Sequence, residues 1–355
     1  MSDDQDQSTQ LQASVKDAIA EGRSLRLRGH GSKDFFGREL GQQQLLDLSG
    51  NRGIVNYEPT ELVITARGGT PLDEIEAALE SNQQMLPFEP PHFDGKGTIG
   101  GAIATGLSGP RRPWGGSPRD LLLGIKMLDG QGRIMDFGGR VMKNVAGYDI
   151  SRLMAGAMGT LGILLEVSIK VLPKPVEEHT LLFDWDPASA ASLVGKMIAD
   201  SQPLTATYCL AEKQAIRLAC SHQRLPGICQ RYGLADASEA DGFWQQLRDH
   251  KLDFFQHPKP LWRLSLKPTS QLELPEPCLQ EWSGGLRWLN SECPAAEIRN
   301  LVEAQGGHAI LFRNGDRSGD VFHPLHPRIA GIQQGLKAVF DPQGLFNPGR
   351  HYPYY

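Results

Sequence analysis

The sequence has few cysteines and no motif that would use them together. Its 355 residues contain five cysteines, which are Cys209, Cys220, Cys229, Cys278 and Cys293. No Cys-x-x-Cys pair occurs, so the usual ligand patterns of an iron–sulfur cluster and of a cysteine zinc site are absent. The odd number and the wide spacings favour a reduced chain over a disulfide framework.

A surplus of positive charge and a long hydrophobic run are also missing. The chain has 36 basic and 41 acidic residues, a net charge of −5. This argues against a general nucleic-acid binder, and no basic run marks a polybasic membrane-binding patch. The most apolar stretch, residues 153–165, is broken by glycine and too short to span a bilayer. The polar N-terminus has no apolar signal-peptide core. We therefore expect a cytoplasmic protein without a transmembrane segment.

Glycine, by contrast, is plentiful. The chain has 40 glycines, and 17 of them lie within residues 95–162. Glycine at this density is typical of backbone that approaches another group closely or adopts positive φ. Residues 95–100 spell G-x-G-x-x-G, but a proline-rich stretch precedes them instead of a strand. This context excludes the nicotinamide-dinucleotide interpretation of the motif.

Helical and β-strand patterns are mixed along the chain, which predicts an α+β protein. The sequence Asp129-Gly130-Gln131-Gly132 separates the apolar stretches 121–128 and 133–137 and is typical of a hairpin turn. Residues 187–200 have helical spacing and follow Asp186, a good N-cap. The second half of the chain predicts an antiparallel sheet with helices on one face.

Other local signals mark helix ends and a boundary. Thr70 can cap a helix whose first turn contains Pro71 and Asp73. The last helix, about 326–340, has large aliphatic residues on one stripe, the spacing of an amphipathic helix. These are Ile329, Ile332, Leu336 and Val339. Pro173-Lys174-Pro175 has the composition of a stiff linker, so we expect a domain boundary there.

A turn with two glycines follows the short strand expected near residues 25–27. Its sequence is Arg28-Gly29-His30-Gly31-Ser32. Two glycines around one residue let consecutive N–H groups point inward, and such a nest can hold a diphosphate without a lysine. Ser32 adds a hydroxyl donor. A plain tight turn is the alternative.

A second segment, residues 98–109, consists mostly of small residues. Bare backbone of this kind can lie against a planar ligand and donate N–H bonds to it. The alternative is close packing of a helix against a sheet, which also requires small residues. Two further segments, 143–163 and 341–350, combine glycine with polar side chains.

Together, in this order, the four segments resemble the FAD-binding fold shared by vanillyl-alcohol oxidase and p-cresol methylhydroxylase (PCMH). In several places the sequence looks more narrowly like the FAD-binding, E-type subunits of glycolate oxidases. These places are residues 67–71, Glu89-Pro-Pro-His92, Gly109-Pro-Arg-Arg-Pro-Trp114, Val141–Arg152 and Phe346–Arg350. The resemblance covers nearly the whole chain and is densest over residues 53–175.

The resemblance implies a fold and a cofactor site. Residues 1–175 would form a PCMH-type FAD-binding domain of two α/β subdomains, 176–335 an α+β cap domain with an antiparallel sheet, and 336–355 a segment that returns to the FAD site. The residues implied to contact FAD are Gly29, His30, Gly31, Ser32, Thr98, Gly100, Gly101, Thr105, Gly109, Gly162, Ile163 and Asn347. We expect non-covalent FAD, because relatives that attach flavin through a histidine carry it after the two glycines, not between them. We expect no metal ligands.

The resemblance also implies a reaction and partners. Oxidation of a small 2-hydroxy acid such as glycolate or D-lactate needs a cation for the carboxylate, a base for the hydroxyl proton and a flavin that accepts hydride. The candidate residues are Arg111, Lys143 and Tyr148; an exposed loop arginine and a satisfied polar turn are the alternatives. The complex would add a second flavin subunit and an iron–sulfur subunit. Through them, the chain could lie at the inner face of the cytoplasmic membrane.

One expected motif is absent. Related hydroxy-acid dehydrogenases carry H-x-G-D-G-N-x-H in the cap domain, and the corresponding stretch here, Asn314–His326, lacks the Gly-Asp-Gly-Asn core. This departure argues against independent substrate oxidation. The leading hypothesis is a subunit that binds FAD and exchanges electrons within a complex. The alternatives are a self-sufficient flavin-dependent 2-hydroxy-acid dehydrogenase and a structural FAD-containing subunit.

Overall fold

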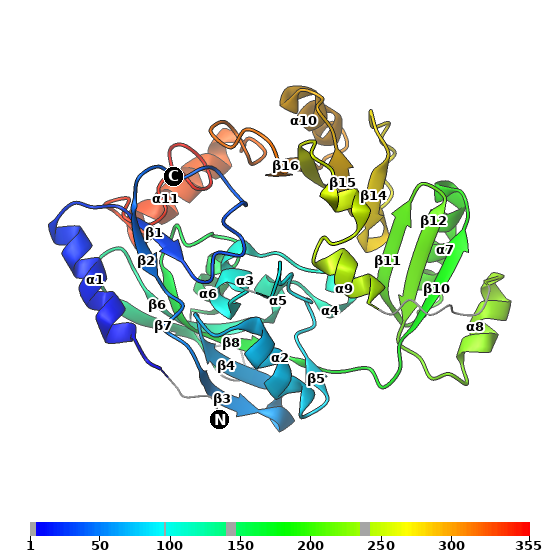
Figure 1. Ribbon diagram of the computed structural model, residues 1–355, viewed down its shortest axis with the longest axis horizontal. Coiled ribbons are helices and arrows are strands. Elements are labelled where there is room, and N and C mark those ends of the chain that lie inside the picture. The colour runs from blue at the N-terminus through cyan, green and yellow to red at the C-terminus, as the bar shows by residue number, and fades with distance from the viewer. Residues whose placement is uncertain (1–4, 96, 140–146, 235–241) are drawn as a thin grey trace. The chain divides into compact units, whose positions relative to one another are not determined.

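The computed structural model describes residues 5–95, 97–139, 147–234 and 242–355. This part of the chain combines helices with mainly antiparallel sheets, so the predicted α+β class is confirmed. The chain divides into two compact units, and Figure 1 colours it by residue number. Unit 1 contains Met1–Ser108, Ser117–Pro173 and Arg317–Tyr355; unit 2 contains Gly109–Gly116 and Lys174–Asp316.

Unit 1 contains a five-stranded antiparallel sheet in the order β3-β4-β8-β6-β7. Its strands are β3 (Ile54–Glu58), β4 (Val63–Arg67), β6 (Leu122–Leu128), β7 (Ile134–Gly138) and β8 (Ile163–Lys170). All residues of β4, and all of β8 except Lys170, are buried. Aliphatic and β-branched side chains suit a strand that is covered on both faces.

The helices of this core are short. They are α2 (Leu72–Glu80), α3 (Ile99–Thr105), α5 (Pro118–Leu121) and α6 (Tyr148–Met154). Leu72, Ile75 and Leu79 recur at helical spacing in α2 and are fully buried in the same cluster as Ile99 and Ile103 of α3. The apolar face of each helix therefore packs into one core with the sheet.

The predicted hairpin between β6 and β7 is confirmed. The two strands pair antiparallel, with Leu128 opposite Ile134. Asp129 stabilises the turn, because its Oδ1 accepts hydrogen bonds from the backbone N–H groups of Gln131 (3.0 Å) and Arg133 (2.8 Å).

A second layer of unit 1 joins segments from both ends of the chain. It contains α1 (Ser8–Ala20) and the parallel pair β1 (Leu25–Arg28) and β2 (Gln44–Asp47). Leu11, Leu25 and Phe346 share one hydrophobic cluster. The blue β1 and the red C-terminal segment therefore lie side by side (Figure 1). The remaining elements of unit 1 are η1 (Pro59–Glu61), β5 (Gln84–Met85), β9 (Leu172–Pro173) and α11 (Pro327–Phe340).

A buried lysine fixes the end of α11. Lys337 Nζ donates hydrogen bonds to the carbonyls of Thr160 (2.6 Å) and Phe346 (3.0 Å) and to Asp341 Oδ2 (2.7 Å). Burial lowers the pKa of Lys337, and the Asp341 carboxylate partly offsets this effect. The lysine thereby connects α11 to the segment that follows it.

Unit 2 is built on a seven-stranded antiparallel sheet in the order β10-β12-β11-β14-β15-β13-β16. The strands are β10 (His179–Asp184), β11 (Leu204–Leu210), β12 (Lys213–Leu218), β13 (Leu261–Ser265), β14 (Cys278–Glu281), β15 (Leu286–Asn290) and β16 (His308–Arg313). The helices and 3-10 turns are α4 (Arg112–Gly115), α7 (Pro187–Ala199), α8 (Leu225–Tyr232), α9 (Phe243–Arg248), η2 (Asp253–Gln256), η3 (Trp282–Gly284) and α10 (Ala295–Glu303). As predicted, Asp186 caps α7; its Oδ1 accepts the N–H groups of Ala188 and Ser189.

Helices cover both faces of this sheet, so the prediction of helices on one face is wrong. Leu181 of β10 packs with Leu193 of α7. The preceding residue, Thr180, accepts a hydrogen bond of 2.9 Å from Trp244 Nε1 of α9. Successive strand residues point to opposite faces. The two helices therefore lie on opposite sides of β10.

Two further local predictions differ from the structure. Thr70 does not cap α2: its hydroxyl accepts from the Gly53 N–H (2.9 Å) and donates to the Arg67 carbonyl (2.7 Å). The aliphatic stripe of α11 is largely exposed, with Ile332 at 61% and Val339 at 63%. An amphipathic helix usually packs through such a stripe, but the buried residues of α11 are Lys337 and Phe340, and Leu336 of the stripe is only partly buried against the core.

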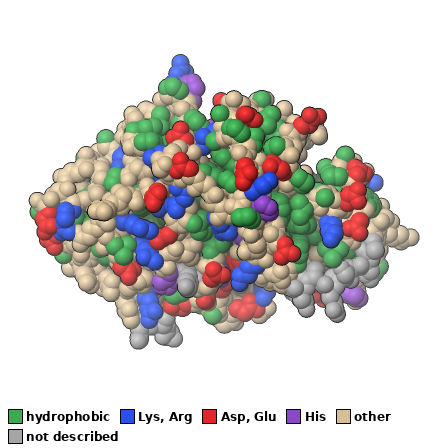
Figure 2. All heavy atoms as spheres, turned by 45° about the horizontal axis from the view of Figure 1, so that its top comes forward, with side chains coloured by type: hydrophobic (Ala, Val, Ile, Leu, Met, Phe, Trp, Pro, Cys, Tyr) green, Lys and Arg blue, Asp and Glu red, His purple; other side chains and the backbone are tan. Residues whose placement is uncertain are grey.

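The described residues include no helix long and apolar enough to cross a membrane. Acidic and basic side chains are interspersed on the face that Figure 2 shows. This distribution agrees with the small net charge of the sequence.

Candidate functional site

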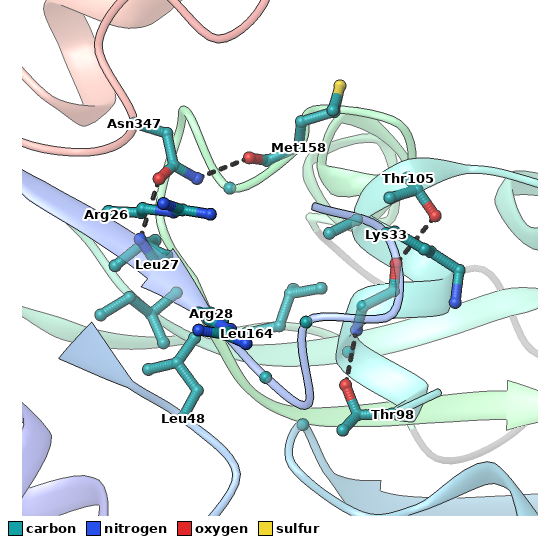
Figure 3. Close-up of a pocket in the computed structure, with 18 of the residues that line it drawn as sticks. Arg26, Leu27, Arg28, Lys33, Leu48, Thr98, Thr105, Met158, Leu164 and Asn347 are labelled. Carbon is teal, nitrogen blue, oxygen red and sulfur yellow. Dashed lines mark hydrogen bonds between the residues drawn. The ribbon is translucent and has the colours of Figure 1, made fainter. Parts of the chain in front are cut away.

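A pocket in unit 1 brings together most of the residues that were predicted to contact a cofactor. It encloses about 980 Å³ of space, part of which is open to solvent. Four segments form most of its wall: β1 with the loop after it, α3, residues 154–164, and the C-terminal segment (Figure 3). Leu40, Leu48 and Gly68 also line it. The predicted residues that line it are Gly29, His30, Gly31, Ser32, Thr98, Gly100, Gly101, Thr105, Gly162, Ile163 and Asn347.

The loop after β1 presents unused backbone donors to this pocket. Within the described residues, the N–H groups of His30, Gly31 and Ser32 donate no hydrogen bond to the protein. Gly31 has a φ of +77°, and a Cβ there would lie 2.5 Å from Arg28 Nε. Consecutive free N–H groups on a left-handed turn are the features of an anion-binding nest.

Charged side chains of the pocket were missed by the sequence analysis. Arg26 and Arg28 extend from β1 and form ion pairs with Asp34 at 2.8 and 3.3 Å. With Lys33 and Arg350, the lining contains four cations and one carboxylate, a formal net charge of +3 with His30 counted as neutral. The alternation Leu-Arg-Leu-Arg in β1 was the available signal, because it places both arginines on one face. The excess positive charge favours an anionic ligand.

The glycine-rich segment that begins at Thr98 forms α3, and its first N–H groups are already used. Thr98 is the N-cap and its Oγ1 accepts the Gly101 N–H at 3.2 Å. The Gly100 N–H donates to the Gly68 carbonyl at 2.8 Å. A Cβ on Gly100 would lie 2.6 Å from that same carbonyl. These glycines therefore serve close packing, the alternative interpretation, and they offer bare backbone to the pocket instead of donors.

Asn347 closes the wall by joining two segments. Its Oδ1 accepts the Leu27 N–H at 2.8 Å and its Nδ2 donates to the Met158 carbonyl at 2.8 Å (Figure 3). The residue is buried and has a φ of +42°, a conformation that asparagine adopts more readily than most side chains. The oxygen and the nitrogen of this amide are therefore both used in hydrogen bonds to the protein backbone. Asn347 therefore shapes the pocket through the backbone that it holds.

The loop after the nest is braced from the C-terminal part of unit 1. Arg317 donates to the carbonyls of Gly37 (2.7 Å) and Asp34 (2.8 Å). Burial, together with Arg317, lowers the pKa of Arg350 to about 10. Arg317 lies in the stretch where related dehydrogenases carry the histidine motif. In this chain, that stretch supports the loop.

Three other predicted residues, Gly109, Arg111 and Tyr148, are not among the residues that line this pocket. Gly109 and Arg111 belong to unit 2, where Gly109 O accepts from Trp282 Nε1 (3.1 Å) and Arg111 pairs with Glu178 (2.7 Å). Tyr148 lies in α6 and its hydroxyl accepts a bond from Arg152 at 3.0 Å. Lys143 lies outside the described residues. The described part of the chain contains no cluster of three His, Cys, Asp or Glu side chains suited to a metal ion.

The pocket fits FAD. Its free N–H groups and net positive lining suit a diphosphate. The bare backbone of α3, with Ile163 and Leu164, offers an uncharged surface for the rest of the cofactor. None of the predicted contact residues in the pocket carries a negative charge that would oppose this ligand.

Comparison with known proteins agrees with this assignment. Residues 6–138 match the family model described as "FAD binding domain". The chain is 44% identical over 348 residues to the glycolate oxidase subunit GlcE of Escherichia coli, which covers 98% of both proteins. It is 33% identical over 154 residues to the glycolate oxidase subunit GlcD of Bacillus subtilis, and 29% identical over 147 residues to a D-lactate dehydrogenase of Anaerostipes hadrus. These two matches cover 43% and 41% of this chain and about a third of each relative.

The fold, the pocket and the domain match define an FAD-binding flavoprotein of the oxidoreductase class. Within that class, the chain belongs to the family of the glycolate oxidase subunit GlcE. The resemblance inferred from the sequence motifs and the assignment of FAD are thereby confirmed.

Proposed function

We propose that this chain is the FAD-binding subunit of a glycolate oxidase complex. In this role it takes part in the oxidation of glycolate to glyoxylate and exchanges electrons with partner subunits. The nest at His30–Ser32, with its free N–H groups in a positively charged pocket, is the structural observation that carries the proposal. Similarity to a glycolate oxidase subunit over 98% of the chain supports the choice of complex.

The two units take different roles in this proposal. Unit 1 is the FAD-binding domain and includes the C-terminal segment from Arg317. Unit 2 is the cap domain. The predicted residues Gly29–Ser32, Thr98, Gly100, Gly101, Thr105, Gly162, Ile163 and Asn347 form the cofactor site, and the cofactor is held without a covalent bond.

The residues of this chain bind and orient the cofactor. The N–H groups of the nest and the guanidinium groups of Arg26 and Arg28 hold the diphosphate, and Asn347 keeps the pocket wall in place. When bound, FAD supplies an acceptor for the two electrons that a 2-hydroxy acid loses as it becomes a 2-oxo acid.

Partner subunits complete the reaction. Two candidates for catalysis, Arg111 and Tyr148, are engaged by Glu178 and Arg152. Of the titratable residues that line the pocket, Asp34 is paired with two arginines and His30 lies on the loop that we assign to the diphosphate, so we assign neither as the base for the hydroxyl proton. We therefore place the electron acceptors, a second flavin subunit and an iron–sulfur subunit, in the same complex. We also propose the cytoplasm, or the inner face of its membrane through these partners, as the location.

The proposal is tested with the purified chain and with the co-expressed complex. We expect the lone chain to show a flavin spectrum that glycolate does not bleach under anaerobic conditions, whereas the complex is bleached. Bleaching of the lone chain would place the substrate site here and support a self-sufficient dehydrogenase. A folded chain that FAD cannot reconstitute would refute the cofactor role. A complex that retains full glycolate oxidation when this chain lacks FAD would indicate a structural subunit.

A further inference from the structure

A second pocket lies within unit 2, between α7 and the seven-stranded sheet. It encloses about 470 Å³ of space, part of which is open to solvent, and this volume is typical of small-molecule sites. Its lining residues all lie between Phe183 and Gly284 and therefore belong to unit 2. None of them lines the FAD pocket. We call this second cavity the α7 pocket.

The sequence of α7 explains why space remains beside its first turns. On one side of this helix, residues at helical spacing become larger toward its C-terminal end. They are Pro187, Ala190, Val194 and Met197. Val194 and Met197 pack with Leu181 of β10 in one hydrophobic cluster. Ala190 is buried but has only a methyl group, and it lines the pocket. Because protein interiors are normally close-packed, a cavity at this place is a specific feature of the chain.

Hydrogen bonds fix two parts of the pocket wall. The buried side-chain amide of Gln214 pairs with the backbone of Trp185, which directly precedes the N-cap of α7. Its Nε2 donates to the Trp185 carbonyl at 2.8 Å, and its Oε1 accepts the Trp185 N–H at 2.9 Å. In another part of the wall, the Ser283 N–H donates to Thr207 Oγ1 at 2.7 Å. A wall that is already ordered lowers the entropic cost of binding a ligand.

The lining of the α7 pocket is uncharged and mainly apolar. Among the described residues that line it, none is Asp, Glu, Lys, Arg or His. The side chains of Phe183, Val194 and Ile216 contribute apolar surface. A charged ligand would lose its hydration here without gaining an ionic partner, which is unfavourable. The lining therefore favours an uncharged ligand, in contrast to the FAD pocket with its positively charged lining.

Thr207 gives this apolar pocket a hydrogen-bond donor. Its hydroxyl oxygen accepts the Ser283 N–H, but its O–H proton has no acceptor among the described residues. Thr207 is buried and lines the pocket. A buried hydroxyl that donates to no acceptor is costly, so a ligand with an acceptor atom is favoured. A carbonyl oxygen supplies such an acceptor without adding charge.

We infer that the α7 pocket binds an uncharged, mainly apolar small molecule with a carbonyl oxygen that accepts a hydrogen bond from Thr207. The apolar part of this ligand packs beside Ala190 and against Phe183 and Ile216, where burial of apolar surface favours binding. The carbonyl oxygen takes the hydroxyl proton of Thr207.

This inference is independent of the proposed function. It concerns a cavity of unit 2 and an uncharged ligand, whereas FAD and the proposed 2-hydroxy-acid substrates are anions. It is therefore tested by binding, not by oxidation.

The experiment titrates acetophenone, an uncharged aromatic ketone, into the FAD-loaded full chain and follows the heat of binding. We expect saturable binding with a Kd below about 1 mM. Benzoate, which has the same ring but a negative charge, should bind at least about tenfold more weakly. Thr207→Val should weaken acetophenone binding about threefold to tenfold, because the hydroxyl is lost. The same variant should bind ethylbenzene, which has no acceptor, as wild type does.

Two further measurements place the ligand in the α7 pocket. Ala190→Leu should fill the cavity and weaken acetophenone binding at least about tenfold. The matched control is Ala188→Leu, the same substitution at an exposed position of α7 outside the lining, which should leave binding unchanged. Acetophenone should also slow alkylation of Cys209, which lines the pocket, but not of Cys293, which does not. Burial raises the pKa of the Cys209 thiol, so alkylation is carried out at alkaline pH.

Several results would overturn the inference. One is the absence of saturable binding up to about 10 mM; another is equal binding of benzoate; a third is equal binding by wild type and Ala190→Leu. Equal weakening of acetophenone and ethylbenzene by Thr207→Val would refute the hydrogen bond. If Ala190→Leu does not fold, as judged by circular dichroism, protection of Cys209 in the wild type decides the location.

The same titration with the co-expressed complex distinguishes a small molecule from a protein partner as the occupant. We expect acetophenone to bind the complex and the lone chain equally well. Binding to the lone chain alone would show that a partner subunit fills the α7 pocket, and would overturn its assignment to a small molecule.

Discussion

The side-chain oxygen of Asn347 accepts a hydrogen bond of 2.8 Å from the backbone N–H of Leu27, a residue 320 positions earlier in the chain. The amide nitrogen of the same side chain donates to the Met158 carbonyl at 2.8 Å. One buried side chain thereby connects two walls of the proposed FAD pocket, β1 and the loop before β8.

Removing this side chain should weaken both the fold and the pocket. We expect Asn347→Ala to lower the free energy of unfolding by about 2–4 kcal/mol, because two buried backbone groups lose their partners. FAD affinity should fall as well, measured by fluorescence titration of the apoprotein. Asn347→Gly allows the same left-handed backbone conformation, so this variant measures the effect of the lost hydrogen bonds without added backbone strain. Wild-type affinity in both variants would show that Asn347 does not shape the pocket.

The nest predicts a specific sensitivity at Gly31. A Cβ there would lie 2.5 Å from Arg28 Nε, so Gly31→Ala should displace Arg28 or the loop and weaken FAD binding about tenfold or more. Gly22→Ala is a matched control, because Gly22 has a similar φ of +63° and open space around it. Both variants incur the cost of alanine in the left-handed region, about 1–2 kcal/mol. Equal FAD affinities in the two variants would contradict the role of the loop.

The ion pair between Arg111 and Glu178 should be structural. Burial raises the pKa of Glu178, but Arg217 and Arg111 outweigh this effect and hold it below its usual value. We expect Arg111→Gln to cost about 2 kcal/mol of unfolding free energy, less than for a fully buried pair because Glu178 is partly exposed. FAD content should not change, and Arg111→Gln with Glu178→Gln should recover part of the loss. A stable Arg111→Gln variant whose complex no longer oxidises glycolate would instead assign Arg111 a catalytic role.

His250 should make stability depend on pH. Burial, reinforced by Arg313 and Arg263, holds the pKa of this side chain well below its usual 6.5. Below pH 6.5 this histidine is protonated in the unfolded chain but stays neutral in the folded chain. The free energy of unfolding therefore falls as the pH decreases, by up to about 1.4 kcal/mol per pH unit. The ring stacks on Phe255 at 3.9 Å, so His250→Phe should keep the packing.

Denaturant unfolding at pH 7 and pH 5 measures this contribution. The difference between the two pH values should be smaller in His250→Phe than in wild type. Replacing the exposed His257 with Gln serves as the control and should leave the difference unchanged. An identical difference in wild type and His250→Phe would contradict the prediction.

Features that depend on a few neighbouring residues could be predicted from the sequence. The turn at Asp129 and the cap at Asp186 were predicted because each carboxylate bonds to N–H groups within four residues of it. The glycine segments of the pocket were found because their order along the chain matches a known family.

Features that depend on distant partners could not be predicted. Thr70 has the sequence of a cap, but its hydroxyl bonds to Gly53, which a neighbouring strand brings close. The pairing of Arg26 and Arg28 with Asp34 depends on the path of the loop after β1. The aliphatic stripe of α11 is largely exposed while Lys337 is buried, and no local pattern reveals a lysine with three internal acceptors.

The pairing of β1 with residues 345–347 also sets an order of events during synthesis. Leu25 exchanges backbone hydrogen bonds with Leu345 and Asn347, and Arg350 lines the same pocket. The loop after β1 is synthesised early, whereas the residues that close the pocket lie more than 300 positions further along the chain and are synthesised late. If this pocket holds FAD as we propose, the nascent chain lacks one wall of the site until translation has passed Arg350.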